Sequence, residues 1–281
     1  MKRLAIIGLG LMGGSLGLAV KKKGLAESVC GYARREENRR DALKQGVVDS
    51  VCDRPEDAVK DADLVIFCVP VLVIPELVKI CKSSLMDKCV VTDVGSTKAH
   101  VVSEVSALLG DSAAEFIGSH PMAGSDQNGL DAARMDLYND AMVVITPSGS
   151  VDAETVTKVK EFWQSLGAEV VSMDPEKHDS IIARTSHLPH LVASMLVSNL
   201  VRDNDQEICR FCGSGFRDTT RIAGGSEDIW HDIVKTNKFS VGRELEELGK
   251  ILKRVKAMID KDDFDGVRRF LAECRHVRRG L

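Results

Sequence analysis

Short apolar runs of strand length alternate with helical patterns over roughly the first 173 residues of the chain. The apolar runs cover residues 4–7, 28–32, 63–70, 88–94, 115–118, 141–146 and 168–173. Helical patterns lie between several of them, at residues 12–23, 36–45, 97–109 and 153–166. The runs are continuously apolar rather than alternating, which is typical of strands that are covered on both faces. The pattern therefore predicts an α/β fold with a mostly parallel, doubly wound sheet.

A glycine-rich turn follows the first strand and precedes a helix. In such a motif the first glycine forms the tight turn, the second lets the backbone approach a pyrophosphate, and the third packs the helix against the strand. The pyrophosphate then rests on the amide groups at the helix N-terminus. This context predicts a Rossmann-type dinucleotide-binding domain over residues 1–173. The expected cofactor-binding residues of the turn are Gly8, Gly10, Leu11, Met12 and Gly13.

Strand-like runs cease after residue 174, and long helical patterns follow. They cover residues 177–201, 227–237, 240–261 and 264–278. Apolar residues recur at spacings of three and four, so each helix carries a single apolar stripe. We therefore predict an all-helical second domain over residues 174–281. Because helices with one apolar stripe need partners, we expect this domain to form a homodimer. Two polar motifs in it, described below, also make it the expected substrate-binding domain.

The composition is typical of a globular protein without a strongly charged surface. The formal net charge is −4, and the sequence has no basic stripe interleaved with aromatic residues, so we expect no nucleic-acid or membrane partner. The basic and apolar start imitates a signal peptide, but it carries several glycines and no Ala-x-Ala cleavage site. We expect a cytoplasmic protein. The eight cysteines are scattered, and the pair Cys209 and Cys212 has no second pair beside it, so we expect no metal site.

His120 is the residue with the clearest chemistry. It follows the glycine turn by about one domain's length, and a histidine that titrates near neutrality can accept the proton of an alcohol whose carbon loses a hydride. This combination predicts a dehydrogenase. Ser96 lies at another strand end, where it either hydrogen-bonds the imidazole or caps the next helix. Asp126 lies in a polar loop directly after His120, and we expect this loop to border the substrate.

Two motifs in the helical half also carry polar groups. Residues 186–190 place His187 and His190 around a proline that frees backbone groups, and we expect one of these histidines to belong to the site. Residues 213–223 combine glycines with Arg217, Asp218 and Arg221. Because guanidinium groups bind carboxylates through two hydrogen bonds, this segment predicts an anionic substrate.

The chain resembles the prephenate/arogenate dehydrogenases of tyrosine biosynthesis over essentially its whole length. The resemblance rests on five motifs in register: GLGLMGGS at 8–15, DVGSTK at 93–98, GSHPMAG at 118–124, SHLPH at 186–190 and GFRDTTRIA at 215–223. It implies an oxidative decarboxylation that gives 4-hydroxyphenylpyruvate or tyrosine. It also implies that His120 accepts the proton of the ring hydroxyl, that Ser96 orients His120 and borders the cofactor, and that the helical domain dimerises. His190 and Arg221 match the substrate-binding positions.

The segment after the second strand bears on the choice of cofactor. A domain that prefers NAD usually has an acidic residue there to hold the ribose 2′-hydroxyl. After this strand the chain has an alanine followed by Arg34 and Arg35, and the first acidic residue of the segment is Glu36. We therefore predict a preference for NADP, with NAD as the second possibility.

The sequence leaves the substrate open between prephenate and arogenate. Arogenate carries an ammonium group where prephenate carries a keto oxygen, and Asp126 or Asp218 could accept a hydrogen bond from the ammonium group. One alternative function is a β-hydroxyacid dehydrogenase, but the catalytic lysine of those enzymes has no match after the glycines at 213 and 215. Another alternative is a non-catalytic protein that senses NADP(H). His120 argues against it, because such a protein would be expected to lack a base at the substrate cleft.

Overall fold

A computed structural model describes residues 1–110, 112–123, 129–149, 151–203 and 206–281 of the chain. These residues form two compact units, Met1–Asn237 and Lys238–Leu281. The first unit holds the sheet and most of the helices, and the second holds two helices. The predicted boundary between two domains after residue 173 lies inside the first unit, and it stays a prediction.

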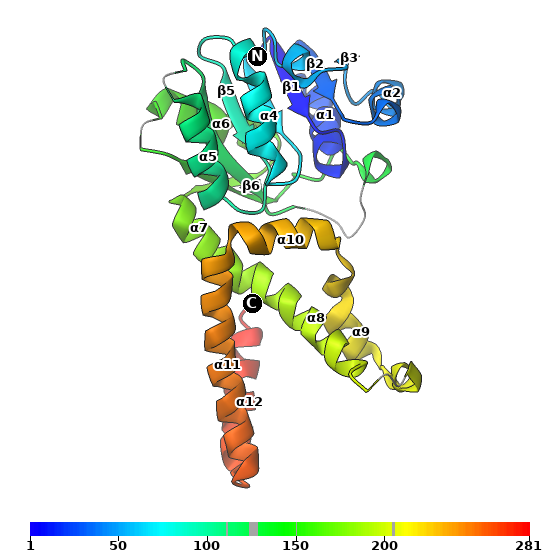
Figure 1. The fold of residues 1–281 in the computed structure, drawn as a ribbon, viewed down its shortest axis with the longest axis vertical. Helices are drawn as coiled ribbons and strands as arrows, with labels where there is room; N and C mark the ends of the chain where they lie inside the picture. The colour runs from blue at the N-terminus through cyan, green and yellow to red at the C-terminus, as the bar shows by residue number, and fades with distance from the viewer. Residues whose placement is uncertain (111, 124–128, 150, 204–205) are drawn as a thin grey trace. The chain divides into compact units, whose positions relative to one another are not determined.

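The described residues of the first unit contain a sheet of eight strands in the order β3-β2-β1-β4-β5-β6-β7-β8 (Figure 1). All neighbouring strands run parallel except β6 and β7, which are antiparallel. The predicted fold class, a mostly parallel α/β sheet followed by helices, is confirmed. The strands are β1 (Arg3–Ile7), β2 (Ser28–Tyr32), β3 (Ser50–Val51), β4 (Leu64–Phe67), β5 (Val90–Asp93), β6 (Glu115–Pro121), β7 (Met142–Pro147) and β8 (Glu169–Ser172).

Helices cover both faces of this sheet. Successive residues of β1 belong to two different apolar clusters: Leu4 and Ile6 to one, Ala5 and Ile7 to the other. The first cluster includes side chains of α1, α2 and α6, and the second includes those of α3, α4 and α5. This burial on both faces explains why the strands read as continuous apolar runs. The helices are α1 (Leu11–Lys23), α2 (Glu36–Lys44), α3 (Pro55–Ala58), α4 (Val73–Cys81), α5 (Ala99–Leu109) and α6 (Ala153–Ser165).

Helical segments complete the first unit after β8. The expected helix over residues 177–201 is not one regular α-helix, because a π-helical segment, η3, interrupts it at Ala183–His187. Pro189 gives a physical reason, since it cannot donate a backbone hydrogen bond within the helix that contains it. The segments are α7 (Pro175–Ile182), η3, α8 (Leu188–Leu200), η4 (Gln206–Phe211), α9 (Ser214–Thr220), η5 (Arg221–Gly224) and α10 (Glu227–Thr236).

The second unit consists of helices α11 (Lys238–Asp260) and α12 (Phe264–Arg278), which pack on each other. Asp263 caps α12, because its carboxylate accepts a hydrogen bond from the Gly266 amide at 2.8 Å. Both helices expose large apolar side chains, among them Leu252 and Phe264. No helix among the described residues is long and apolar enough to cross a membrane.

Candidate active site

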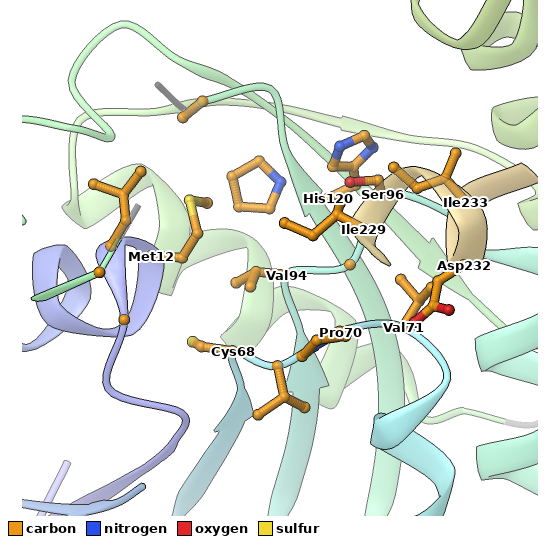
Figure 2. Close-up of a pocket in the computed structure, with 17 residues that line it drawn as sticks. Met12, Cys68, Pro70, Val71, Val94, Ser96, His120, Ile229, Asp232 and Ile233 are labelled. Atoms are coloured by element: carbon orange, nitrogen blue, oxygen red, sulfur yellow. The ribbon is translucent and has the colours of Figure 1, made fainter. Parts of the chain in front are cut away.

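A cavity of about 380 Å³ lies at the carboxyl ends of β1, β4, β5 and β6 (Figure 2). Parallel sheets bind their ligands at this edge. The ends of the strands and the loops after them form most of the wall, and the start of α1 and helix α10 also contribute to it. The lining residues are Gly10, Leu11, Met12, Cys68, Val69, Pro70, Val71, Val94, Gly95, Ser96, His120, Pro121, Ala123, Gly129, Ile229, Asp232 and Ile233.

The glycine turn at one end of this cavity has the geometry that a dinucleotide needs. Gly8 adopts a φ of 111°, which favours glycine. A Cβ atom on Gly13 would lie 1.9 Å from the carbonyl oxygen of Gly8, whereas one on Gly10 would meet nothing within 4 Å. Helix α1 begins after Gly10 with no side-chain cap and no acidic residue in its first turn. Its free amide groups and the open space at Gly10 therefore suit a pyrophosphate.

A second cavity of about 280 Å³ shares part of its wall with the first. Both are lined by Ser96 and His120, which Figure 2 shows beside each other. The second cavity adds side chains from the helical segments. Its lining residues are Ser96, His120, Pro121, Met122, Ala123, Ser186, His187, Trp230 and Ile233. His120 thus borders both a space for a dinucleotide and a space for a second, smaller molecule.

A chain of buried hydrogen bonds connects His120 with helix α7. The Nδ1 atom of His120 lies 2.8 Å from Nε2 of His178, and Nδ1 of His178 lies 2.8 Å from Oδ1 of Asp179. The same Oδ1 atom accepts the Lys98 amide hydrogen at 2.8 Å, and Oδ2 accepts that of Ala99 at 3.0 Å. Asp179 therefore caps the N-terminus of α5 and holds His178 at the same time.

These contacts determine which nitrogen of His120 carries its proton. The Asp179 carboxylate can only accept, so Nδ1 of His178 donates to it, and Nε2 of His178 is the acceptor that faces Nδ1 of His120. His120 then donates its Nδ1–H to His178. The remaining nitrogen of His120, Nε2, is left with a free lone pair. An unprotonated nitrogen on a ring that borders a cavity is what a general base requires.

The electrostatic surroundings keep His120 neutral. Burial lowers the pKa of His120 well below its usual value, and the nearby ammonium group of Lys98 lowers this pKa further. A proton accepted from a substrate would be held weakly and returned easily. Base strength is thus reduced, but the unprotonated form is fully available at neutral pH.

A buried ion pair fixes the strands beneath His120. The ammonium group of Lys98 donates to the carboxylate of Asp93, and both side chains are fully buried. Asp93 also accepts hydrogen bonds from the amides of Gly95 at 2.8 Å and Ser119 at 3.0 Å. It therefore links the end of β5 to β6 at the residue before His120.

Comparison with known proteins agrees with this site. The family model "Prephenate dehydrogenase, nucleotide-binding domain" matches residues 16–172, and "Prephenate dehydrogenase, dimerization domain" matches residues 174–273. The prephenate dehydrogenase of Bacillus subtilis is 34% identical, with 99% of this chain and 76% of that protein covered. The chain belongs to the prephenate dehydrogenase family. The family predicted from the five motifs, and with it an oxidoreductase activity, is confirmed.

Two further relatives match over nearly their full length. The cyclohexadienyl dehydrogenase of Zymomonas mobilis is 32% identical, with 100% of this chain and 96% of that protein covered. The crystal structure of the A. aeolicus prephenate dehydrogenase, which holds hydroxyphenyl propionate and NAD+, has a TM-score of 0.93 and 31% sequence identity. It covers 99% of this chain and 97% of its own. The relative therefore binds a nicotinamide dinucleotide and a ring compound together.

The structure brings some of the predicted site residues together. The glycine turn, Ser96 and His120 line one cavity. The expectation that Ser96 follows a strand holds, but His120 lies within β6, because β7 pairs with this strand as far as Pro121. The alternative that Ser96 caps the next helix is wrong, since Lys98 is the N-cap of α5 and Asp179 takes the first amides.

Other predicted residues lie away from His120. The ring of His190 stacks on Trp230 with 3.5 Å between centroids, and it lines a neighbouring cavity of about 500 Å³ that Trp230 also lines. Arg217 and Asp218 on α9 and Arg221 on η5 are exposed, and none of them lines a cavity with His120. Asp126 lies outside the described residues.

The predicted cofactor-discriminating arginines directly follow β2, at the edge of the sheet where the glycine turn lies. Arg34 and Arg35 are exposed, and Arg35 is the N-cap of α2. Arg39, which the sequence analysis did not single out, donates to the carbonyl oxygen of Ala33 at 2.7 Å and to the carboxylate of Asp53 at 2.8 Å. Arg39 thus holds in place the segment that carries the other two arginines.

The sequence analysis also missed the groups behind His120. His178 and Asp179 are adjacent on α7, and only the fold brings them to the imidazole. Lys98 is part of the motif DVGSTK at 93–98, and this motif is the one sequence feature that points to Lys98 as a site residue. Trp230 and Asp232 line the cavities from a helix that shows only an amphipathic pattern in the sequence.

Proposed function

We propose that this chain oxidatively decarboxylates prephenate, and also arogenate, with His120 as the proton acceptor. The observation that carries this proposal is the position of His120. It borders both the dinucleotide cavity and the smaller cavity, and its hydrogen bond to His178 leaves Nε2 free to accept. The products are 4-hydroxyphenylpyruvate from prephenate and tyrosine from arogenate.

The reaction requires His120 to take up one proton and then release it. Nε2 of His120 accepts the proton of the ring hydroxyl, and the resulting imidazolium is stabilised by its Nδ1–H bond to His178 and by the carboxylate of Asp179 behind it. The bond between the ring and its carboxylate breaks, carbon dioxide leaves, and the electron pair enters the ring and makes it aromatic. The phenolic oxygen then takes the proton back from His120. Ser96, which lines both cavities, orients the ring hydroxyl and the imidazole.

The dinucleotide is held by the glycine turn and the first turn of α1. Gly8, Gly10 and Gly13 shape the turn, and Gly10, Leu11 and Met12 line the cavity. When bound, a nicotinamide dinucleotide supplies the acceptor for the hydride that leaves the carbinol carbon.

We propose further that NADP is preferred over NAD. Arg34 and Arg35 offer two exposed guanidinium groups at the position where a ribose 2′-phosphate is read, and no acidic side chain lies between the end of β2 and Glu36. The support is electrostatic, since these cations attract a phosphate dianion and Arg39 fixes the loop that carries them. An efficiency with NAD equal to that with NADP would contradict the preference. Arg34→Ala should lower the efficiency with NADP alone, and Arg210→Ala, on η4, is the matched control.

The substrate is bound through its two carboxylates and its side chain. We keep Arg221 and His190 as substrate-binding residues, because Ala223 of η5 and His190 line a cavity that shares Trp230 with the His120 cavity. Arg217 and Asp218 are the neighbouring candidates on α9.

Asp126 is proposed to accept a hydrogen bond from the ammonium group of arogenate, so Asp126→Gln should shift the ratio of catalytic efficiencies toward prephenate. An unchanged ratio would remove Asp126 from substrate selection.

We propose that the chain forms a homodimer through its helical region. The helices of the second unit expose the large apolar side chains Ile251, Leu252, Phe264, Leu271 and Val277. Such a set is typical of an interface rather than of a surface in water. Sedimentation equilibrium tests the proposal, and a monomer at micromolar concentration would contradict it.

The central experiment follows the absorbance of the reduced cofactor with prephenate or arogenate. The wild-type protein should turn over at least one of them. His120→Asn should bind cofactor normally and lose turnover by about a hundredfold or more, the usual size of a general-base contribution. His276→Asn, on α12, is the control for the loss of an exposed histidine. Near-normal turnover of a folded His120→Asn protein would exclude His120 as the base.

A further inference from the structure

His187 has a buried nitrogen that the reaction described above does not use. The residue ends the π-helical segment η3, is 1% exposed and lines the smaller cavity together with His120. Its Nε2 atom is one of two buried side-chain nitrogen or oxygen atoms in the described chain without a hydrogen-bond partner. Buried polar atoms in native proteins are almost always paired, so this nitrogen calls for an explanation.

The neighbours of His187 determine that this nitrogen carries a hydrogen. Nδ2 of Asn237 lies 2.7 Å from the carbonyl oxygen of Asp179, which can only accept, so the orientation of the amide is fixed. The same Nδ2 lies 3.3 Å from Nδ1 of His187, which must therefore accept. Burial lowers the pKa of His187 to about 4, so the ring is neutral. A neutral imidazole that accepts at Nδ1 donates at Nε2.

We propose that the Nε2–H of His187 donates a hydrogen bond to the ring carboxylate of the substrate, the one that leaves as carbon dioxide. This inference rests on the proposed function. Ser96, Ser186 and Trp230 line the same cavity, and its described wall contains no lysine or arginine. The ring carboxylate and the ring hydroxyl lie at opposite ends of one six-membered ring. A hydrogen-bond donor for the ring carboxylate therefore belongs in the same small cavity as His120, the base that accepts the proton of the ring hydroxyl.

The neutrality of His187 matches the chemistry of the leaving group. The carboxylate loses its negative charge as the electron pair moves into the ring. A fixed cation beside it would stabilise the charged ground state and oppose the reaction, whereas a neutral N–H holds the group with a smaller penalty. Asn237 keeps the proton on Nε2, and His187 therefore fixes the orientation of the ring without taking part in proton transfer.

The product provides a direct test, because 4-hydroxyphenylpyruvate has lost the ring carboxylate. Calorimetry should show that His187→Leu weakens the binding of prephenate about ten- to a hundredfold, the size of a lost hydrogen bond to a charged group. The affinity for 4-hydroxyphenylpyruvate should stay unchanged. His187→Gln, which retains an N–H donor at a similar distance from the backbone, should recover most of the affinity for prephenate. His276→Leu, on α12, is the control and should bind both ligands as the wild type does.

Two results would overturn the proposal: equal weakening of prephenate and 4-hydroxyphenylpyruvate binding, or unchanged prephenate binding in folded His187→Leu protein. Should that variant fail to fold, ¹⁵N-histidine NMR of the wild type replaces it. The Nε2–H signal of His187 should shift with prephenate and not with the product, and an unprotonated Nε2 or equal shifts would refute the assignment. The proposed function fails separately, if wild-type protein turns over neither prephenate nor arogenate with either cofactor.

Discussion

Replacing His178 with phenylalanine tests whether the buried chain behind His120 contributes to catalysis. Phenylalanine keeps the planar shape, and the fully buried position excludes water from the space it fills. The change removes the acceptor that lies 2.8 Å from Nδ1 of His120. Asp179 retains its two hydrogen bonds to the amides at the start of α5, so the cap of that helix is preserved.

The expected magnitude follows from the change of charge on His120 during the reaction. A hydrogen bond between neutral groups contributes about 0.5–1.5 kcal/mol, and one that involves a charged group about 1.5–3 kcal/mol. The bond to His178 therefore strengthens by about 1–1.5 kcal/mol when His120 becomes an imidazolium, which corresponds to about tenfold in kcat. Loss of the preferred tautomer adds to this effect. The KM for substrate should change little, because the substrate does not touch His178.

The assay is the steady-state production of reduced cofactor, measured at saturating and limiting substrate. Thermal unfolding monitors the folded state, and His276→Phe, an exposed histidine on α12, is the matched control. A folded His178→Phe protein with unchanged kcat would refute the reasoning. An effect confined to KM would show that His178 shapes the cavity and does not orient the base.

Three further predictions concern the base, the turn and the substrate. Because burial lowers the pKa of His120, kcat/KM should be constant at neutral pH and fall only below the usual histidine value of about 6.5, and a pH profile with its acid limb above that value would contradict this. Gly13→Ala should destabilise the protein, since its Cβ would lie 1.9 Å from a backbone oxygen, whereas Gly10→Ala should leave the Tm unchanged and weaken cofactor binding in a fluorescence titration. Arg221→Ala should raise the KM for prephenate about tenfold and leave that for the cofactor unchanged. If Arg217→Ala raised the KM for prephenate and Arg221→Ala did not, Arg217 rather than Arg221 would be the residue that binds the substrate carboxylate.

The elements of the sheet could be predicted because their signals are local. Continuous apolar runs, glycine turns and strand-end motifs each depend on a few neighbouring residues, and the ends of parallel strands meet at one edge. This reasoning placed the glycine turn, Ser96 and His120 in one cavity, as the structure shows. The roles of these residues in the reaction stay predictions.

The helical part of the site could not be predicted in the same way. The apolar pattern over residues 177–201 indicates helix throughout, and Pro189 is the one local sign that the regular helix is interrupted near His187. Asp179 bonds to amides about 80 residues away, and nothing in the sequence near position 179 distinguishes it from a solvent-exposed acid. Contacts over such separations follow from how the helices pack on the sheet.

The helical segments after β8 therefore do more than close the cavity. His120 stands on β6, but the hydrogen bonds that set its tautomer come from α7, and those that set the tautomer of His187 involve α7 and the end of α10. Asp179 takes part in both arrangements, through its side chain toward His178 and through its carbonyl oxygen toward Asn237. His120, which must accept a proton, and His187, which must donate a hydrogen bond and stay neutral, thus depend on the same turn of α7. A shift of that turn would disturb both imidazoles at once, even though Asp179 itself lines neither cavity.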